Sequence, residues 1–206
     1  MKRRDFLRTT GAFASLTMLP SSAWARVKNG KLRTAFIGVG GKGLSNLTSI
    51  ASHPMVEVIA LCDVDATRLA KAAELFPDAK HYVDYRILYE ELGKSLDAVA
   101  VSTPDHTHAP ASMMAMEMGK HIFCEKPLTH HVSESRAMNN LAMEKGLISQ
   151  MGIQCHSSDC YKQAVVLIQN GIIGKVHTVR AWSPKNWGYD GAAPGGSDPI
   201  PESLDW

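Results

Sequence analysis

The sequence lacks the cysteine patterns that hold a structural metal. Its four cysteines form no C-x-x-C pair, and none stands at zinc-finger spacing from histidines. Cys62 and Cys124 lie in apolar runs, so we expect both to be buried as small hydrophobic side chains. Cys155 and Cys160 could pair in an oxidising compartment, although we favour free thiols for both.

An excess of charge of one sign is also missing. The 206 residues hold 22 Lys and Arg against 20 Asp and Glu, a formal net charge of +2. Four basic residues against Asp5 give the first 25 residues a balance of +3, which leaves −1 for the remainder. The remainder therefore offers no basic surface to nucleic acid. A hydrophobic content of 45% predicts a folded core.

No apolar run reaches the roughly 20 residues that a membrane-spanning helix needs. A shorter one, "TTGAFASLTML", follows Arg3 and Arg4 and precedes small residues at Ala23 and Ala25. This order of charge, apolar segment and cleavage site resembles a bacterial twin-arginine signal, and it disfavours an ordinary basic N-terminus. We therefore predict that residues 1–25 are a signal peptide and that the mature protein is exported, already folded, to the periplasm or beyond.

Beyond the signal, apolar runs alternate with segments of helix length. The runs are "TAFIGV", "VEVIALCDV", "DAVAVS", "HIFC" and "LISQMGI", with helices expected between them at residues 42–52, 65–75, 107–118 and 133–145. Runs that are apolar throughout indicate strands covered on both faces, as in a parallel sheet. The repeated order of strand and helix predicts an α/β fold with a doubly wound parallel sheet.

A glycine-rich turn, "GVGGKG", follows the first apolar run directly. Gly38, Gly40 and Gly43 satisfy G-x-G-x-x-G, which permits a tight turn, close approach of a pyrophosphate, and packing of the next helix on the strand. The N-H groups and dipole of that helix would face the phosphates. The second strand ends at Asp63, twenty residues after Gly43, where a ribose-binding carboxylate is expected. Together these features predict a Rossmann dinucleotide-binding domain.

Asp63 also bears on which dinucleotide binds. A carboxylate that accepts the ribose hydroxyls repels a 2′-phosphate, so we predict NAD as the cofactor in preference to NADP. Arg68 is close enough in sequence to neutralise such a phosphate if its side chain turns inward. We favour the alternative that Arg68 is a solvated charge on the exposed face of its helix.

Two histidines occur in "VSTPDHTHAP", where Pro104 stops a strand and Asp105 or Thr107 could cap the next helix. His106 and His108 would lie near the nicotinamide, because open α/β sheets bind ligands at the carboxyl ends of their strands. A metal site is disfavoured, because histidines at this spacing diverge by about 200 degrees in a helix and no third ligand is evident. We predict a cofactor contact for His108, a structural role for His106 and no bound metal.

The segment "HIFCEKP" ends the next strand, at the same edge of the sheet as the glycine loop. Lys126 would face the nicotinamide there, and Pro127 would fix the backbone that aims it. An ammonium at that position can donate to a substrate hydroxyl or carbonyl oxygen and stabilise the negative charge that develops during hydride transfer. We predict that Lys126 is catalytic; the alternative is a solvated charge at a strand end.

The pattern changes after residue 152. We predict that residues 26–152 form the Rossmann domain and that residues 153–206 begin a second, incomplete α/β domain. A helix is expected from Asp159 to Asn170, ended by Gly171, and "GKVHTVRAW" alternates like a half-buried strand. A single strand is not stable alone, so partners beyond this sequence are expected.

Four motifs, "GVGGKG", "CDVD", "STPDHTH" and "CEKP", occur in this order within residues 32–182. In order and spacing they resemble the Gfo/Idh/MocA family of glucose-fructose oxidoreductases and inositol dehydrogenases. The resemblance implies an NAD(P)-dependent oxidoreductase that moves hydride between the nicotinamide and a sugar or cyclitol hydroxyl, with Lys126 catalytic. It implies dinucleotide contacts from Gly38, Gly40, Gly43, Asp63, His108, Glu125 and Gln154. It also implies an aspartate and a histidine from the second domain, beyond residue 206, and a homo-oligomer for the full-length protein.

Two other functions stay open. Some members of the family use tightly held NAD to hydrolyse glycosides through transient oxidation, without net redox change. A chain without the rest of its second domain could instead be a nucleotide-binding module without turnover. The sugar or polyol substrate is not determined, because the pocket that selects it would belong mostly to the second domain.

Export through the twin-arginine pathway can be tested on the paired arginines. Replacing both, Arg3→Lys and Arg4→Lys, should leave uncleaved protein in the cytoplasm, because the pathway reads the arginine pair. Cell fractionation and the mass of the protein in each fraction would measure this. Normal export and processing of the double variant would show that the twin-arginine assignment is wrong.

Overall fold

The structure is a computed structural model that describes residues 30–182 and 199–205. The predicted signal peptide, residues 1–25, lies outside the described residues, as does part of the predicted second domain. Within the described residues, no helix is both long and apolar enough to cross a membrane.

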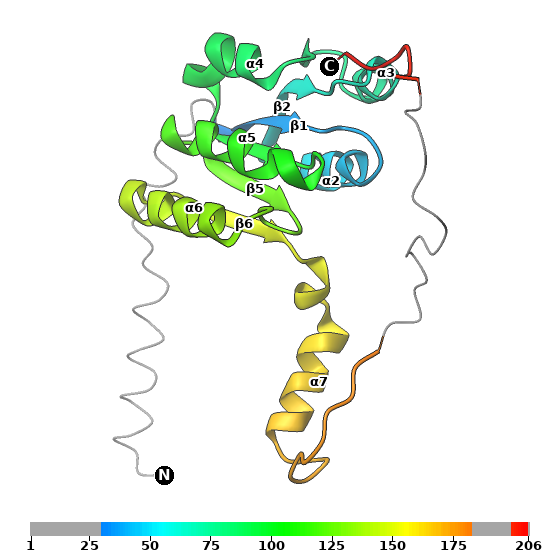
Figure 1. Cartoon of the computed structure of the whole chain (residues 1–206), viewed down its shortest axis with the longest axis vertical. Helices are drawn as coiled ribbons and strands as arrows, with labels where there is room; N and C mark the ends of the chain where they lie inside the picture. Colours follow the sequence, from blue (N-terminus) through cyan, green and yellow to red (C-terminus); the bar gives the residue numbers. More distant parts are fainter. Residues whose placement is uncertain (1–29, 183–198, 206) are drawn as a thin grey trace.

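One six-stranded sheet forms the centre of the molecule (Figure 1). Its strands are β1 (Leu32–Ile37), β2 (Val56–Cys62), β3 (Lys80–Tyr82), β4 (Ala98–Val101), β5 (His121–Glu125) and β6 (Ser149–Gly152). The spatial order is β3-β2-β1-β4-β5-β6, and every neighbouring pair is parallel. The predicted doubly wound parallel sheet is therefore confirmed. The order reverses between β1 and β4, and open sheets of this kind bind ligands at that switch point, outside the carboxyl ends of the strands.

Helices cover both faces of the sheet. They are α2 (Lys42–Ala51), α3 (Ala66–Leu75), α4 (Tyr85–Leu92), α5 (Asp105–Glu117) and α6 (Val132–Lys145). Successive side chains of β1 point to opposite faces, so Phe36 lies in the core with α2 and α3, while Ala35 and Ile37 lie in the core with α4, α5 and α6. Because both faces are buried, the inner parts of the central strands are apolar, as the sequence predicted, while Arg33, Thr34 and Glu57 lie toward the strand starts.

The sequence analysis missed strand β3, helix α4 and the short 3-10 helix η4 (Gly93–Ser95). Strand β3 has three residues and buries only Tyr82, so it leaves almost no apolar pattern. Helix α4 is amphipathic, with Leu88 and Tyr89 buried among polar neighbours. Its start could have been recognised, because Asp84 caps it by accepting from the backbone N-H of Arg86 at 2.8 Å.

The predicted cap of helix α5 is wrong. The helix begins at Asp105, and Pro104 is its N-cap, without a side-chain hydrogen bond. Neither Asp105 nor Thr107 therefore caps it. Asp105 lies in the first turn instead, where its charge is favourable beside the positive end of the helix dipole.

Beyond β6 the chain leaves the sheet through a 3-10 helix, η5 (Gln154–Ser157), and enters α7 (Asp159–Gln169). The predicted helix is confirmed to within one residue, and Gly171 follows it with a φ of 77°. The predicted strand "GKVHTVRAW" is wrong: residues 175–182 form no strand and are exposed, because no described strand lies beside them to bond their backbone groups. The boundary at residue 153 stays a prediction.

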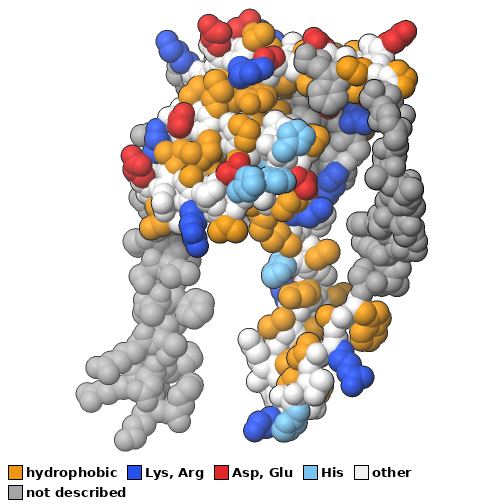
Figure 2. Space-filling view, viewed as in Figure 1, with side chains coloured by type: hydrophobic (Ala, Val, Ile, Leu, Met, Phe, Trp, Pro, Cys, Tyr) orange, Lys and Arg blue, Asp and Glu red, His pale blue; other side chains and the backbone are white. Residues whose placement is uncertain are grey.

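Helix α7 projects away from the sheet and exposes apolar side chains (Figures 1 and 2). Among the exposed residues are Tyr161, Val165, Val166, Leu167 and Ile168. None of its residues is buried, so α7 takes no part in the described core.

The last described segment, residues 199–205, returns to the sheet beside α3 (Figure 1). The Ala66 N-H donates to the Ser203 carbonyl oxygen at 2.8 Å, and the Asp205 N-H donates to the Val64 carbonyl oxygen at 2.9 Å. This short antiparallel bridge pairs Leu204 with Asp65, which lies two residues after Asp63.

The four cysteines are free thiols in two environments. Burial, together with the nearby Asp63 and Asp84 carboxylates, raises the pKa of Cys62 to about 12. Burial also raises the pKa of Cys124 to about 11. Cys155 and Cys160 are exposed.

Alkylation with iodoacetamide at pH 8 should therefore divide the cysteines. Cys155 and Cys160 should react quickly, whereas Cys62 and Cys124 should resist until urea unfolds the chain, because the thiolate is the reactive form. Mass spectrometry of digested protein measures each site. Fast labelling of Cys62 or Cys124 would contradict their burial, and labelling of Cys155 and Cys160 only after reduction would show that they pair.

Candidate active site

The glycine loop connects β1 to α2 at the carboxyl edge of the sheet. Gly38 has a φ of 78°, and a Cβ there would lie 2.7 Å from the carbonyl carbon of Ser102. A Cβ on Gly43 would collide with the Gly38 carbonyl oxygen. The turn and packing roles predicted for these two glycines are therefore confirmed. Their contact with a pyrophosphate stays a prediction.

Asp63 ties the end of β2 to the glycine loop. Its carboxylate is buried and accepts from the backbone N-H of Val39 at 2.8 Å and from that of Asp65 at 3.0 Å. A carboxylate has about four acceptor positions, so these two bonds leave capacity for ribose hydroxyls. The predicted ribose contact remains a prediction, and the structure adds a second task for Asp63, which is to hold the loop.

The prediction that Arg68 is a solvated charge is confirmed by its exposure, but its stem turns over the glycine loop. A Cβ on Gly40 would collide with Cδ of Arg68, so the arginine stem crosses the glycine loop. Arg68 Nε lies 3.2 Å from Asp65 Oδ2, and the side chain remains 62% exposed. The guanidinium is thus solvated but turned toward the loop, because Asp65 attracts it.

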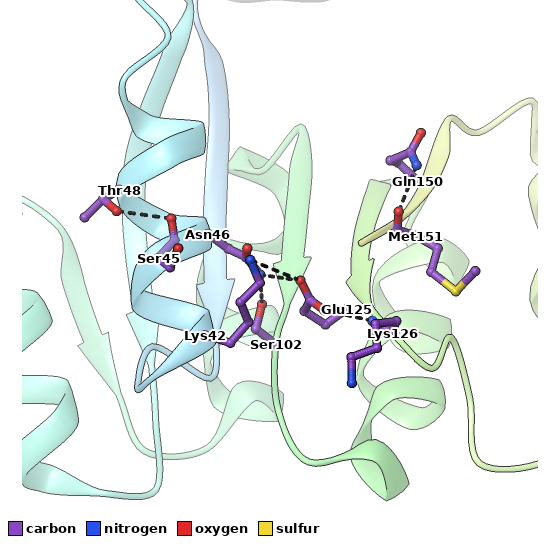
Figure 3. Close-up of polar contacts among 9 residues, drawn as sticks. All are labelled: Lys42, Ser45, Asn46, Thr48, Ser102, Glu125, Lys126, Gln150 and Met151. Atoms are coloured by element: carbon purple, nitrogen blue, oxygen red, sulfur yellow. Dashed lines mark hydrogen bonds and ion pairs between the residues drawn. The ribbon is translucent and has the colours of Figure 1, made fainter. Parts of the chain in front are cut away.

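Glu125, at the end of β5, is the centre of a polar network (Figure 3). Its Oε1 accepts from Asn46 Nδ2 at 3.0 Å and lies 3.9 Å from Lys42 Nζ, while its Oε2 accepts from the Lys126 N-H at 3.0 Å. Asn46 Nδ2 also donates to Ser102 Oγ at 3.0 Å. The network therefore joins α2 to the loops after β4 and β5.

Burial makes this network structurally important. Glu125 is 5% exposed and Asn46 is 7% exposed. A buried carboxylate is costly unless it is hydrogen-bonded, which the amide and the backbone N-H provide. The end of β6 leaves room for it, because a Cβ on Gly152 would lie 2.6 Å from Glu125 Oε1. Glu125 was predicted as a dinucleotide contact; that stays a prediction, and its described partners are all protein groups.

Lys126 follows Glu125 at the same edge and is exposed. In Figure 3 its side chain extends away from the Glu125 carboxylate. Within the described part of the chain, its ammonium has no hydrogen-bond or ion-pair partner. The structure thus presents a free ammonium beside the network, as a donor to a substrate oxygen would require.

The two histidines of α5 separate as their spacing predicted. His106 is exposed, whereas His108 is 1% exposed. The ring nitrogens of His108 lie 2.6 Å from the Pro127 carbonyl oxygen and 2.8 Å from the Thr103 carbonyl oxygen. His108 therefore ties the loops after β4 and β5, and its contact with the cofactor stays a prediction. In residues 30–182 and 199–205, no three His, Cys, Asp or Glu side chains gather as a metal site.

Gln154 joins the site from η5. With its amide oriented to satisfy both partners, it donates to the Gly152 carbonyl oxygen at 2.9 Å and accepts from Lys42 Nζ at 3.1 Å. Lys42 thus stands between Glu125 and Gln154. The structure brings both predicted residues to one place, although neither has been tested as a dinucleotide contact.

The sequence analysis missed Lys42, Asn46 and Ser102. One signal could have found Asn46, which lies on the apolar face of α2 beside Gly43 and Leu47. A polar residue at a buried helix position needs a polar partner. Lys42 lies four residues before Asn46, on the same side of the helix.

Comparison with known proteins also identifies the sheet and its helices as a Rossmann domain. Residues 32–153 match the GFO_IDH_MocA model, an oxidoreductase family with an NAD-binding Rossmann fold. The chain is 36% identical over 137 residues to a glycosyl hydrolase family 109 protein of Stenotrophomonas maltophilia, covering 61% of this chain and 29% of that protein. It is 32% identical over 146 residues to scyllo-inositol 2-dehydrogenase (NAD(+)) of Bacillus subtilis, covering 70% and 42%.

Two solved structures are similar. Myo-inositol 2-dehydrogenase from Lactobacillus plantarum has a TM-score of 0.65 and 28% identity, covering 71% of this chain and 43% of that one. A 3-ketoreductase from Actinomadura kijaniata, in complex with TDP-benzene and NADP, has a TM-score of 0.63 and 26% identity, covering 70% and 45%. The chain thus spans less than half the length of each of these relatives.

The contribution of the Glu125 network to stability can be measured through Asn46. The Asn46→Ala variant leaves a buried carboxylate without its amide donor, so the free energy of unfolding should fall by about 1–3 kcal/mol. Urea unfolding of the chain measures it. Ser49→Ala, at an exposed position of the same helix, is the control and should stay within about 0.5 kcal/mol. Equal values for the two variants would show that the Asn46 bond adds no stability.

Proposed function

This chain belongs to the Gfo/Idh/MocA oxidoreductase family, and on that basis we propose that it binds NAD(P) and contributes to hydride transfer at a sugar or cyclitol hydroxyl. One observation carries the proposal. The 3.0 Å hydrogen bond between Asn46 and Glu125 joins the glycine-loop helix to the strand that ends in Lys126. The dinucleotide cradle and the free ammonium therefore share one rigid edge of the sheet.

The chain's own residues fit the cofactor. Gly38 and Gly43 permit the tight turn that brings the glycine loop to the start of α2, whose N-H groups would face the pyrophosphate, and Asp63 has acceptor capacity for the ribose. When bound, the nicotinamide supplies the carbon that accepts or gives up the hydride. NAD(P) is supported by the family, and both NAD(+) and NADP occur in the names of similar proteins.

Lys126 would act on the substrate oxygen. Its ammonium can donate a hydrogen bond to a hydroxyl or carbonyl oxygen and stabilise negative charge that develops there. Asn46 and Lys42 act indirectly, because they hold the Glu125 carboxylate that accepts from the Lys126 N-H. The backbone at Lys126 is thereby fixed, which leaves its side chain to adjust to the substrate.

The proposed substrate and reaction rest on the relatives, and the proposed export rests on the sequence. The inositol dehydrogenases favour a cyclitol or sugar as substrate, whereas the family 109 relative keeps glycoside hydrolysis as the alternative. Consumption of stoichiometric NAD would favour the dehydrogenase, and turnover without net reduction would favour the hydrolase. Export to the periplasm and assembly into a homo-oligomer are proposed for the full-length protein on the same basis.

The role of Lys126 can be tested in the full-length product of the gene. Lys126→Met should slow hydride transfer by about 100-fold to 10,000-fold, the usual range for a positioned proton-transfer group. Affinity for NAD should change little, because the glycine loop and Asp63 lie at other strands. Single-turnover reduction of bound NAD, by the sugar or polyol that reacts fastest in a screen, measures the rate.

A matched control is Lys94→Met, which removes an exposed lysine in η4, before β4 and so at the opposite edge of the sheet. Its rate should equal that of the parent. If Lys126→Met also stays within about threefold of the parent, less than about 0.7 kcal/mol in barrier, Lys126 is a solvated strand terminus and not catalytic.

A further inference from the structure

Arg68 and Asp65 form an ion pair beside the expected ribose site. The pair is 3.2 Å from Arg68 Nε to Asp65 Oδ2, and the arginine stem lies against Gly40. Asp65 also donates its backbone N-H to the carboxylate of Asp63 at 3.0 Å. The one cation in this cluster is thus placed between the glycine loop and the end of β2.

The position of this cation matters for the choice of dinucleotide. In Rossmann domains the 2′ position of the adenosine ribose is recognised after the second strand, by an acid for NAD or by an arginine for NADP. This chain has both residue types there, Asp63 and Arg68. The affinity for a 2′-phosphate therefore depends on whether the guanidinium is free to bind it.

We propose that Asp65 sets the preference of this site for NAD by holding Arg68 in an ion pair. The inference rests on the proposed dinucleotide binding and adds its specificity determinant. While the pair is intact, a 2′-phosphate would meet the carboxylates of Asp63 and Asp65, and Asp65 would offset the charge of Arg68 through the contact with Nε. If the negative charge at residue 65 is removed, Arg68 can turn its full charge and all of its N-H groups, Nε included, to the phosphate.

The backbone of Asp65 is fixed from two sides, which makes the pair persistent. Its N-H is bound by Asp63, and its main chain forms the antiparallel bridge with Leu204. The side chain is only 14% exposed, and its Oδ1 caps α3 by accepting from the Thr67 N-H at 2.9 Å. A carboxylate held in this way stays within reach of Arg68, one turn along the helix.

The test is the ratio of dissociation constants for NADP and NAD, measured by calorimetric titration of the chain. Asp65→Asn removes the charge and keeps the cap, because asparagine caps helices as well as aspartate. The parent should bind NAD more tightly. In Asp65→Asn the NADP to NAD ratio should fall by about tenfold, as expected for one charge-assisted hydrogen bond gained by the 2′-phosphate.

Arg68→Met provides the matched background, because it keeps an apolar stem over Gly40 and removes the charge. If Asp65 acts through Arg68, adding Asp65→Asn to Arg68→Met should change the ratio by less than about threefold. Adenosine 2′,5′-bisphosphate and 5′-AMP, which differ only in the 2′-phosphate, should show the same pattern, since they report the adenosine end alone.

Three results would overturn the inference. They are an unchanged ratio in Asp65→Asn, an equal fall of the ratio in the presence and absence of Arg68, or tighter NADP than NAD binding by the parent. Failure of the parent to bind either dinucleotide would be a different result, because it would remove the proposed function and this inference with it.

Discussion

The buried carboxylate of Glu125 is the constraint on which the arrangement of α2 and the end of β5 depends. A carboxyl group that is 5% exposed must be compensated by hydrogen-bond donors, and the structure supplies them from α2 and from the backbone just after β5. Gly152 provides the space on the other side. A shift of α2 would therefore take the Asn46 donor away from this carboxylate and would also break the bond from Asn46 to Ser102 after β4.

Asp63 has the corresponding role between the end of β2 and the glycine loop. It accepts from the glycine loop through Val39 and from the start of the α3 segment through Asp65. The two buried acids thus lie on either side of the switch point between β1 and β4. The exposed cations Lys42 and Arg68 each lie beside an acid, Lys42 at 3.9 Å from Glu125 and Arg68 at 3.2 Å from Asp65, which offsets part of their charge.

The core and most of the candidate site lie in the same part of the chain. The core is built from the part of the sequence that runs from β1 to β6, and its apolar side chains cover both faces of the sheet. Residues 153–182 contribute no buried side chain, although Gln154 reaches back to Lys42. The apolar surface of α7 is therefore outside the packing that positions the described site.

The sequence by itself determined the parallel sheet, the glycine loop, Asp63 and the place of Lys126 at a strand end, because these depend on local pattern and on the shared direction of parallel strands. It did not determine β3, whose edge position leaves almost no apolar pattern, nor the failure of residues 175–182 to form a strand, which depends on a partner strand. Only the tertiary structure decided that Asn46 meets Glu125, 79 residues away, and that Arg68 turns over Gly40. Contacts of this kind depend on which side chains the folded sheet brings together, and spacing along the chain does not encode that.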